Sequence, residues 1–319
     1  MEIRKPQPLR PGDLIGVISP ASPPKPEKVE QYQRGLTYLR DLGYHIVEGQ
    51  HVLDQYGYLA GTDADRAADI NAMFRNPRVR AIICSRGGYG TPRILDRIDY
   101  EAIRNDPKIL VGYSDITSLH LAIHAQTGLI TFSGPMVAVE MGKGILRLTE
   151  SSFWRQVTQP RRFTMKAATG DYTPRVYHGG SGEGRLLGGC LSLINPLIGT
   201  PYLPDFDGAI LVLEDIGEDV YGIDRYLVQL RLSGILDGLN GLILGQFLDM
   251  DSGEKSEPSL SLDQVIQEHT HQLKIPILGN FPYGHQDYKY TMPIGCRVRL
   301  DADQGTLALL EAPLEKSNV

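Results

Sequence analysis

Short apolar runs alternate with amphipathic stretches through the first half of the chain. The apolar runs predict strands, which fall at 14–19, 44–47, 79–84, 109–112 and 130–132. Between them, apolar positions spaced three and four residues apart predict helices at 27–42, 63–74 and 116–125. Repeated strand–helix units imply a parallel sheet that is covered by helices on both faces. We therefore expect an α/β domain in this half.

The pattern weakens between residues 144 and 184, where Ser, Thr, basic residues and glycines interrupt it. Beyond it, helices are predicted at 191–198, 223–232 and 262–273, and strands at 209–213, 241–244, 275–278, 298–300 and 307–310. A length of 319 residues also suggests two domains. We expect an N-terminal α/β domain over 1–145, a connection over 146–175 and a C-terminal α/β domain over 176–319.

Charge and composition exclude several classes of protein. The net charge is −6, and the basic residues are scattered, without the Lys/Arg stripe that contacts nucleic-acid phosphates. We see no secretory signal, and no apolar run approaches the ~18 residues of a spanning helix. Three widely spaced cysteines, Cys84, Cys190 and Cys296, indicate buried thiols rather than disulfides or a metal site. We expect a cytoplasmic protein that binds neither nucleic acid nor membrane.

Ser114 is the sharpest chemical signal. It follows the apolar strand 109–112, and a helix begins directly after Asp115. A tight turn between strand and helix exposes a serine hydroxyl beside backbone N–H groups, as in a nucleophile elbow. Ile116 stands where the usual GxSxG pattern has its second glycine. The alternative is that Ser114 or Asp115 only caps the helix.

A glycine-rich loop, Gly87-Gly88-Tyr89-Gly90, follows the strand at 79–84. Glycines at a strand end let the backbone approach a ligand and present N–H groups, which suits an oxyanion hole or a phosphate cradle. The loop matches neither GxGxxG nor the P-loop, so a nucleotide site is the weaker interpretation. A plain tight turn remains the alternative.

An acid and a base are available in the second half. Glu214 ends the apolar strand 209–213, where a histidine-orienting carboxylate is expected, although Asp215, Glu218 and Asp219 are rivals. His285 lies in a Gly/Pro loop after a strand, the setting of a positioned base. Ser114, Glu214 and His285 follow the Ser–acid–His order of the α/β-hydrolases, which predicts a site between the two domains.

The remaining histidines carry weaker signals. His120 and His124 are four residues apart on one predicted helix, but the segment lacks the Glu of a zinc protease helix. We expect both to be partly buried structural residues, and we predict no metal and no cofactor.

At this point a set of motifs resembles the LD-carboxypeptidases, the muramoyltetrapeptide carboxypeptidases with the microcin-immunity peptidases as a side branch. The resemblance extends from about residue 12 to residue 300. The motifs are Gly61-Thr-Asp63, Arg86-Gly-Gly-Tyr-Gly90, Gly112-Tyr-Ser-Asp-Ile-Thr117, Gly134-Pro-Met136, Gly199-Thr-Pro-Tyr202, Leu213-Glu-Asp215, Ile223-Asp-Arg225 and Gly284-His285.

The resemblance implies a serine peptidase without metal or cofactor that releases D-alanine from recycled murein tetrapeptides. Ser114 would be the nucleophile, His285 the base and Glu214 the group that orients it. The backbone N–H groups of Gly88 and Asp115 would form the oxyanion hole, with Gly87 as a rival donor. The family also implies a flavodoxin-like or Rossmann-like N-terminal domain, a C-terminal domain with a β-rich core, and a homodimer.

Exopeptidase action also requires a group that holds the substrate's free carboxylate. Arg86 is a candidate because a guanidinium binds a carboxylate with two hydrogen bonds, and Gly87 and Tyr89 are further candidates for substrate contacts. Cys190 stands where the family commonly has Asn, and Ser133 where it has a ring residue. Both departures leave the fine specificity open.

Two alternatives stay open. The first is a peptidyl-nucleotide antibiotic as substrate, as in the microcin-immunity branch, whose extra aromatic-bearing loop has no counterpart in the loop at 250–258. The second is a non-catalytic protein whose two lobes close on a small ligand.

Overall fold

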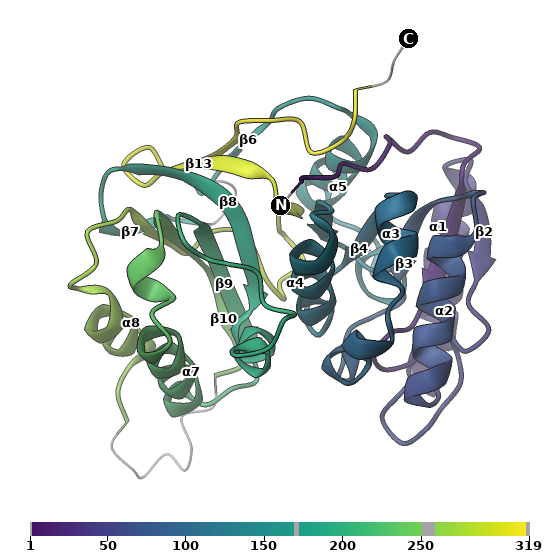
Figure 1. Cartoon of the computed structure of the whole chain (residues 1–319), viewed down its shortest axis with the longest axis horizontal. Coiled ribbons are helices and arrows are strands. Elements are labelled where there is room, and N and C mark those ends of the chain that lie inside the picture. The colour runs from purple at the N-terminus through teal and green to yellow at the C-terminus, as the bar shows by residue number, and fades with distance from the viewer. Residues whose placement is uncertain (1, 169–171, 251–258, 317–319) are drawn as a thin grey trace.

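The computed structural model describes residues 2–168, 172–250 and 259–316, which form two lobes, each built around a sheet (Figure 1). In these residues the first sheet has the order β12-β5-β4-β3-β1-β2. Strands β1 to β5 run parallel, and β12 is antiparallel to β5. The bounds are β1 Leu14–Ile18, β2 His45–Glu48, β3 Val79–Cys84, β4 Ile109–Gly112, β5 Thr131–Ser133 and β12 Met292–Ile294.

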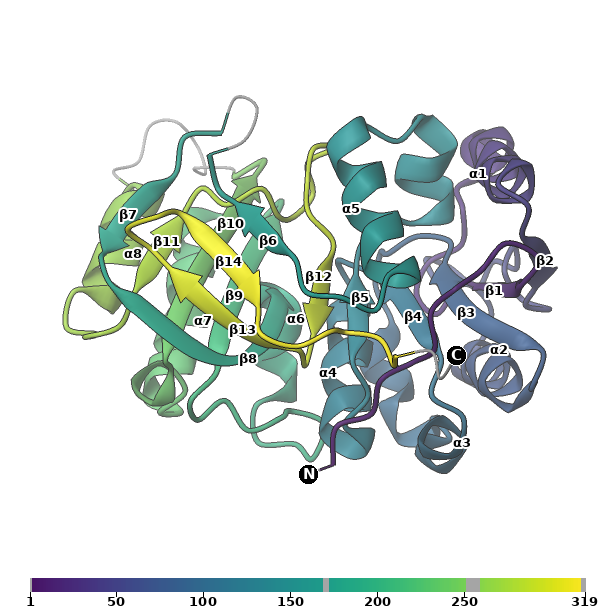
Figure 2. The ribbon, with the colours of Figure 1, turned by 90° about the horizontal axis from the view of Figure 1, so that it is seen from above.

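Helices cover both faces of this sheet. Figure 2 shows α1 and α5 on one face and α2, α3 and α4 on the other. Their bounds are α1 Val29–Asp41, α2 Asp63–Arg75, α3 Tyr100–Asn105, α4 Ile116–Thr127 and α5 Arg147–Thr158. Because both faces are covered, strand β4 is a continuous buried apolar run, and in strand β3 only Arg80 is exposed. Helix α2 starts at a capping box between Thr62 and Asp65.

The second sheet, within the described residues, has the order β6-β14-β13-β8-β9-β10-β11-β7. Strands β8 to β11 are parallel, and antiparallel strands extend the sheet on both sides. The strand bounds are β6 Thr164–Lys166, β7 Arg175–His178, β8 Ser181–Cys190, β9 Ile210–Ile216, β10 Gly241–Leu248, β11 Ile277–Gly279, β13 Arg297–Asp301 and β14 Thr306–Leu309. The helices of this lobe are α6 Leu191–Ile194, α7 Val220–Leu232 and α8 Leu262–Thr270.

The expected α/β class, with a parallel sheet in the N-terminal half, is confirmed. Several elements escaped the sequence pattern. The weakly patterned segment contains α5, β6, β7 and the start of β8, and β12 returns from late in the chain to complete the edge of the first sheet. The proposed domain limits stay a prediction. The predicted loop insertion at 250–258 lies, apart from residue 250, outside the described residues.

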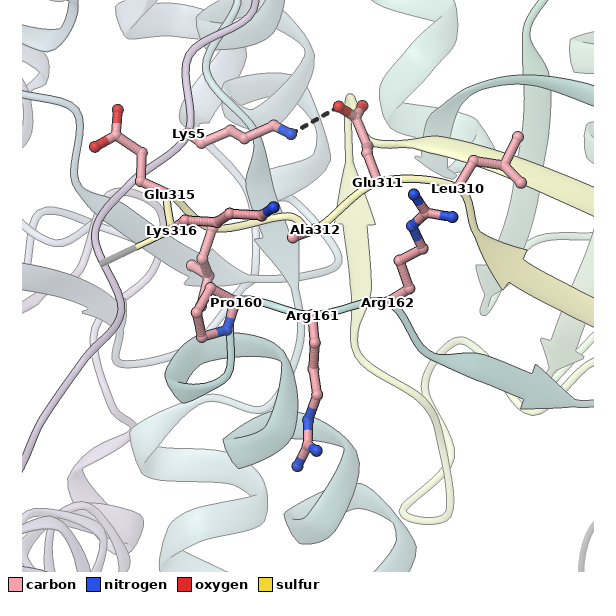
Figure 3. Close-up of a pocket in the computed structure, with 10 residues that line it drawn as sticks. Lys5, Pro160, Arg161, Arg162, Leu310, Glu311, Ala312, Glu315 and Lys316 are labelled. Atoms are coloured by element: carbon pink, nitrogen blue, oxygen red, sulfur yellow. Dashed lines mark ion pairs between the residues drawn. The ribbon is translucent and has the colours of Figure 1, made fainter. Parts of the chain in front are cut away.

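The N-terminal and C-terminal segments lie side by side, joined by a 3.0 Å hydrogen bond from the Glu315 amide to the Pro6 carbonyl. A hollow of about 660 Å³ lies between residue 5, residues 160–162, residues 310–312 and residues 314–316. Figure 3 shows its lining side chains, among them Lys5, which forms a 2.7 Å ion pair with Glu311. None of the helices in the described part of the chain combines the length and apolar character needed to span a bilayer.

Candidate active site

Ser114 occupies the turn between β4 and α4. Its φ of 65° lies in the left-handed region, which residues other than glycine rarely adopt. This conformation turns the chain sharply from strand to helix and leaves the Ser114 side chain partly exposed. Asp115 is the N-cap of α4, but its side chain makes no capping hydrogen bond. A simple capping role for Asp115 is therefore wrong.

His285 links Ser114 to Glu214. Its Nε2 lies 2.9 Å from the Ser114 Oγ, and its Nδ1 lies 2.7 Å from the Glu214 Oε2. Ser114 is 171 residues from His285 in the sequence, and Glu214 is 71 residues from it. When Nδ1 donates its proton to the buried carboxylate, Nε2 is left to accept the hydroxyl proton. The three groups thus form one hydrogen-bonded row.

Gly284 lets the histidine loop pass close over the carboxylate. Its φ is 123°, and a Cβ at this position would lie 2.9 Å from the Glu214 Oε2. A larger residue would therefore push the loop away from Glu214. The side chain of Glu214 is only 1% exposed, so its carboxylate is shielded from water.

The rival acids have other partners. The Asp215 carboxylate accepts hydrogen bonds from the Ser192 and Ile216 amides at 2.7 and 2.9 Å, and it therefore fixes the start of α6. The Glu218 carboxylate accepts a 3.3 Å hydrogen bond from the Tyr226 hydroxyl. Asp219 precedes α7 as its N-cap. Of the four candidate acids, Glu214 is therefore the one that contacts His285.

The glycine-rich loop lies directly against the nucleophile. A Cβ on Gly87 would lie 2.9 Å from the Ser114 Cβ, so a glycine is needed for this approach. The Asp115 carboxylate accepts hydrogen bonds from the Gly90 and Thr91 amides at 3.1 and 2.8 Å. Burial raises the pKa of Asp115, and these bonds oppose the rise. Asp115 therefore holds the loop in place with its side chain, a role that its sequence position did not indicate.

Three amide groups are available beside Ser114. Among the described residues, the N–H groups of Gly87, Gly88 and Asp115 donate to no protein acceptor. Backbone N–H groups without a protein acceptor beside a nucleophile are the kind of donor that stabilises a developing oxyanion. The structure is thus compatible with both predicted donors, Gly88 and Asp115, and with Gly87 as the rival.

The two predicted substrate-binding side chains lie on either side of these glycines. Arg86 is half-buried, and its Nη1 lies 3.3 Å from the Pro23 carbonyl oxygen. Burial lowers the pKa of the Arg86 guanidinium, although an arginine remains charged at neutral pH. Tyr89 is 48% exposed and packs edge-on against Tyr58, with 5.7 Å between the ring centroids.

A buried polar cluster that the sequence pattern did not indicate lies behind the imidazole. The Tyr113 hydroxyl donates a 2.8 Å hydrogen bond to Glu140, which also forms an ion pair with Lys289. The Lys289 Nζ lies 3.5 Å from the centroid of the Tyr113 ring, a cation–π contact. The Tyr113 ring meets the His285 ring at 5.2 Å between centroids. The cluster therefore joins the nucleophile turn to the loop that carries the base.

The remaining residues singled out from the sequence lie in the protein interior. His120 and His124 are fully buried rather than partly buried, and burial lowers the pKa of each to about 4. All three cysteines are buried and free. The Cys190 Sγ lies 3.3 Å from the Asp215 Oδ1, and the Ser133 hydroxyl oxygen lies 2.8 Å from the Tyr283 hydroxyl oxygen. Cys190 and Ser133, which differ from the family pattern, are thus only about 2% exposed, and the polar atoms of their side chains have partners within the protein.

Two family models match this chain. Residues 15–134 match the LD-carboxypeptidase N-terminal domain, and residues 183–300 match the LD-carboxypeptidase C-terminal domain. The chain belongs to the LD-carboxypeptidase family. The first match contains Ser114, and the second contains Glu214 and His285, so the hydrogen-bonded row joins the two matched regions.

Relatives from both branches of the family cover almost the whole chain. The probable murein peptide carboxypeptidase of Bacillus subtilis is 41% identical over 308 residues, which is 97% of this chain and 94% of the relative. The microcin C7 self-immunity protein MccF of Escherichia coli is 29% identical over 330 residues, 95% of each chain. A solved structure of wild-type MccF without ligand has a TM-score of 0.89 at 28% identity and covers 98% of this chain and all of its own.

A solved member of the carboxypeptidase branch is also similar. The muramoyltetrapeptide carboxypeptidase of Oxalobacter formigenes has a TM-score of 0.80 at 30% identity, with 93% of this chain and 97% of that chain covered.

Proposed function

We propose that this protein is a serine-type LD-carboxypeptidase that releases the terminal D-alanine from murein tetrapeptides in the cytoplasm during cell-wall recycling. The observation that carries the proposal is the row Ser114–His285–Glu214, with contacts of 2.9 and 2.7 Å. The names of two relatives, a probable murein peptide carboxypeptidase and a muramoyltetrapeptide carboxypeptidase, support the substrate class.

In the proposed reaction, His285 takes the proton of Ser114 as the Oγ attacks the carbonyl carbon of the penultimate residue. The N–H groups of Gly88 and Asp115 stabilise the oxyanion. The carbon–nitrogen bond then breaks, and His285 gives its proton to the leaving D-alanine amine. Water, deprotonated by His285, attacks the acyl-enzyme ester, and the proton returns to the Ser114 oxygen as the shortened peptide leaves.

The test is D-alanine release from a defined murein tetrapeptide by the wild type, by Ser114→Ala and by Ser151→Ala. Ser151 is an exposed serine on α5, so its variant is a matched control. Removing the nucleophile should lower turnover by roughly 10³-fold or more, and the control should match the wild type. Equal release by Ser114→Ala and wild type would overturn the assignment.

A second candidate substrate is a peptidyl-nucleotide antibiotic, because the MccF structure has the higher TM-score of the two solved relatives described above. The same triad would act on it. Turnover of such a conjugate by the wild type, without release of D-alanine from tetrapeptide, would favour this candidate.

The family resemblance also leads us to propose a homodimer. Light scattering of the purified protein tests it, with twice the chain mass of 35.3 kDa as the expected result. A mass equal to one chain over the concentrations used for the assay would contradict the proposal.

A further inference from the structure

A small pocket lined by basic residues lies beside the candidate active site. Its volume is about 160 Å³, and four of its lining side chains are cationic: Lys25, Lys28, Arg86 and Lys143. We call it the basic pocket. Its other lining residues are uncharged, so all of the formal charge that faces it is positive.

The pocket lies where this type of sheet binds ligands. In the first sheet β1 has β2 on one side and β3 on the other, so the connections after β1 and β3 diverge. Lys25 follows β1 and Arg86 follows β3. Ligands of open parallel sheets bind beyond the strand ends at this reversal of strand order. The position is therefore independent support for a binding site.

The cations of the pocket lack close counter-ions. Among the described residues, no carboxylate lies within 4.0 Å of the side-chain nitrogens of Lys25, Lys28 or Arg86. Lys143 has a long contact of 3.8 Å with Asp287. Burial lowers the pKa of Arg86, and Glu27, which does not line the pocket, raises it to a smaller extent. An anion bound here would be attracted by four charges without displacing a tight ion pair.

The pocket is also connected to the catalytic groups from two sides. Arg86 directly precedes Gly87, whose Cβ position lies 2.9 Å from the Ser114 Cβ. Lys143 contacts Asp287, two residues beyond His285. In a peptide the terminal carboxylate carbon is only three bonds beyond the scissile carbonyl carbon, which corresponds to roughly 4 Å. A terminal carboxylate thus needs a binding group within a few ångströms of the scissile carbon, and Arg86, next in the chain to Gly87, is the pocket residue nearest to Ser114 along the loop.

From this placement we infer that the basic pocket binds a carboxylate group of the peptide substrate. The inference rests on the proposed peptidase function and assigns part of its substrate recognition. Arg86 would hold the carboxylate with two hydrogen bonds, and the lysines would add attraction from the rim. An exopeptidase must recognise the terminal carboxylate, but a side-chain carboxylate has the same chemistry, so the experiment includes both.

The experiment measures peptide binding by calorimetry in the Ser114→Ala background, which prevents turnover. Three peptides are compared: murein tetrapeptide, its C-terminal amide, and a form whose side-chain carboxylates are amides. The pocket variants are Arg86→Gln and the double variant Lys25→Gln/Lys28→Gln. The control is Lys274→Gln, an exposed lysine before β11 in the other lobe.

For the unmodified peptide, Arg86→Gln should weaken binding by roughly 10- to 100-fold. The double lysine variant should weaken it by roughly 3- to 10-fold, and the control should leave it unchanged. Because the lysines are exposed, their variant still reports on the pocket if Arg86→Gln fails to fold. Against the peptide that lacks the bound carboxylate, the same variants should have no effect, and this identifies which carboxylate occupies the pocket.

The inference would be overturned if the pocket variants lost the same affinity for all three peptides, or lost affinity for none of them. The proposed function is tested separately by D-alanine release from the wild type. If the wild type releases D-alanine while the pocket variants show no carboxylate-dependent loss, only the inference fails. If the wild type releases none and the Ser114→Ala protein binds no peptide, the proposed function fails as well.

Discussion

Replacing Lys289 tests how the loop that carries His285 is held in place. Its Nζ pairs with Glu140, and the two side chains are only 3% and 2% exposed. Lys289→Met keeps most of the volume but leaves the Glu140 carboxylate buried without its cation. Removing one partner of a buried pair costs about 3–5 kcal/mol. Because hydrogen bonds from the Tyr113 hydroxyl and the Met136 amide remain, at 2.8 and 3.0 Å, we expect a loss near the lower end, about 3 kcal/mol.

The pKa of Glu140 supports the sign of this effect. Burial raises that pKa, but the Lys289 ammonium and the hydrogen bonds outweigh burial and hold it below its usual range. Glu140 is therefore ionised at neutral pH in the folded protein. Lys289→Met would leave this negative charge buried without its cation. The double variant Glu140→Gln/Lys289→Met removes both charges and should recover most of the lost stability.

Urea unfolding at neutral pH measures the loss, with Lys274→Met as an exposed control that should stay within about 0.5 kcal/mol of the wild type. Activity gives a second readout. Lys289 follows His285 in the same loop and contacts the Tyr113 ring, so Lys289→Met should lower kcat by roughly 10-fold with little change in KM. A loss of stability below about 1 kcal/mol would refute the reasoning.

Three further predictions follow from the site. Gly87→Ala places a methyl carbon 2.9 Å from the Ser114 Cβ, so it should lower kcat by roughly 10- to 100-fold. Circular dichroism should show an intact fold, and an unchanged kcat would contradict the geometry. Asp115→Asn replaces the acceptor of two amides with a group that offers one oxygen, so the urea unfolding free energy should fall by about 1–3 kcal/mol, and no fall would count against its role in holding the loop. The pKa values of His120 and His124 fall from 6.5 to about 4 because burial disfavours imidazolium, so between these values the unfolded chain binds more protons. Stability should therefore decrease as the pH falls through this window, by up to about 1.4 kcal/mol per pH unit for each histidine, and urea unfolding of His120→Gln/His124→Gln should show a flatter pH dependence than the wild type.

The parallel strands of the first sheet were predictable because their signals are local. Strands buried on both faces become continuous apolar runs, and β3 and β4 have the bounds that their apolar residues predict. Ser114 was found for the same reason, since a strand, a turn and a helix follow one another within a few residues. By contrast, β8 is rich in glycine and β12 has only three residues, so neither carries enough alternation to indicate a strand.

The tertiary contacts of the site were less accessible. Tyr113 and Glu140 are 27 residues apart, and Glu140 and Lys289 are 149 apart, so no spacing rule connects them. Glu140 also lies in a single π-helical turn, Val137–Met141, without a strong pattern. The side-chain role of Asp115 depends on where the glycine-rich loop folds back. In each case the role of a buried charged residue becomes apparent only when the position of its partner in the fold is known.

The central claim is that Ser114 is the nucleophile and that His285 activates it. Intact-mass spectrometry after treatment with a fluorophosphonate, followed by peptide mapping, tests this claim most directly. The account predicts one adduct per wild-type chain, on Ser114, none on Ser114→Ala, and much slower labelling of His285→Ala. An adduct that persists in Ser114→Ala, or that maps to another serine in the wild type, would contradict it.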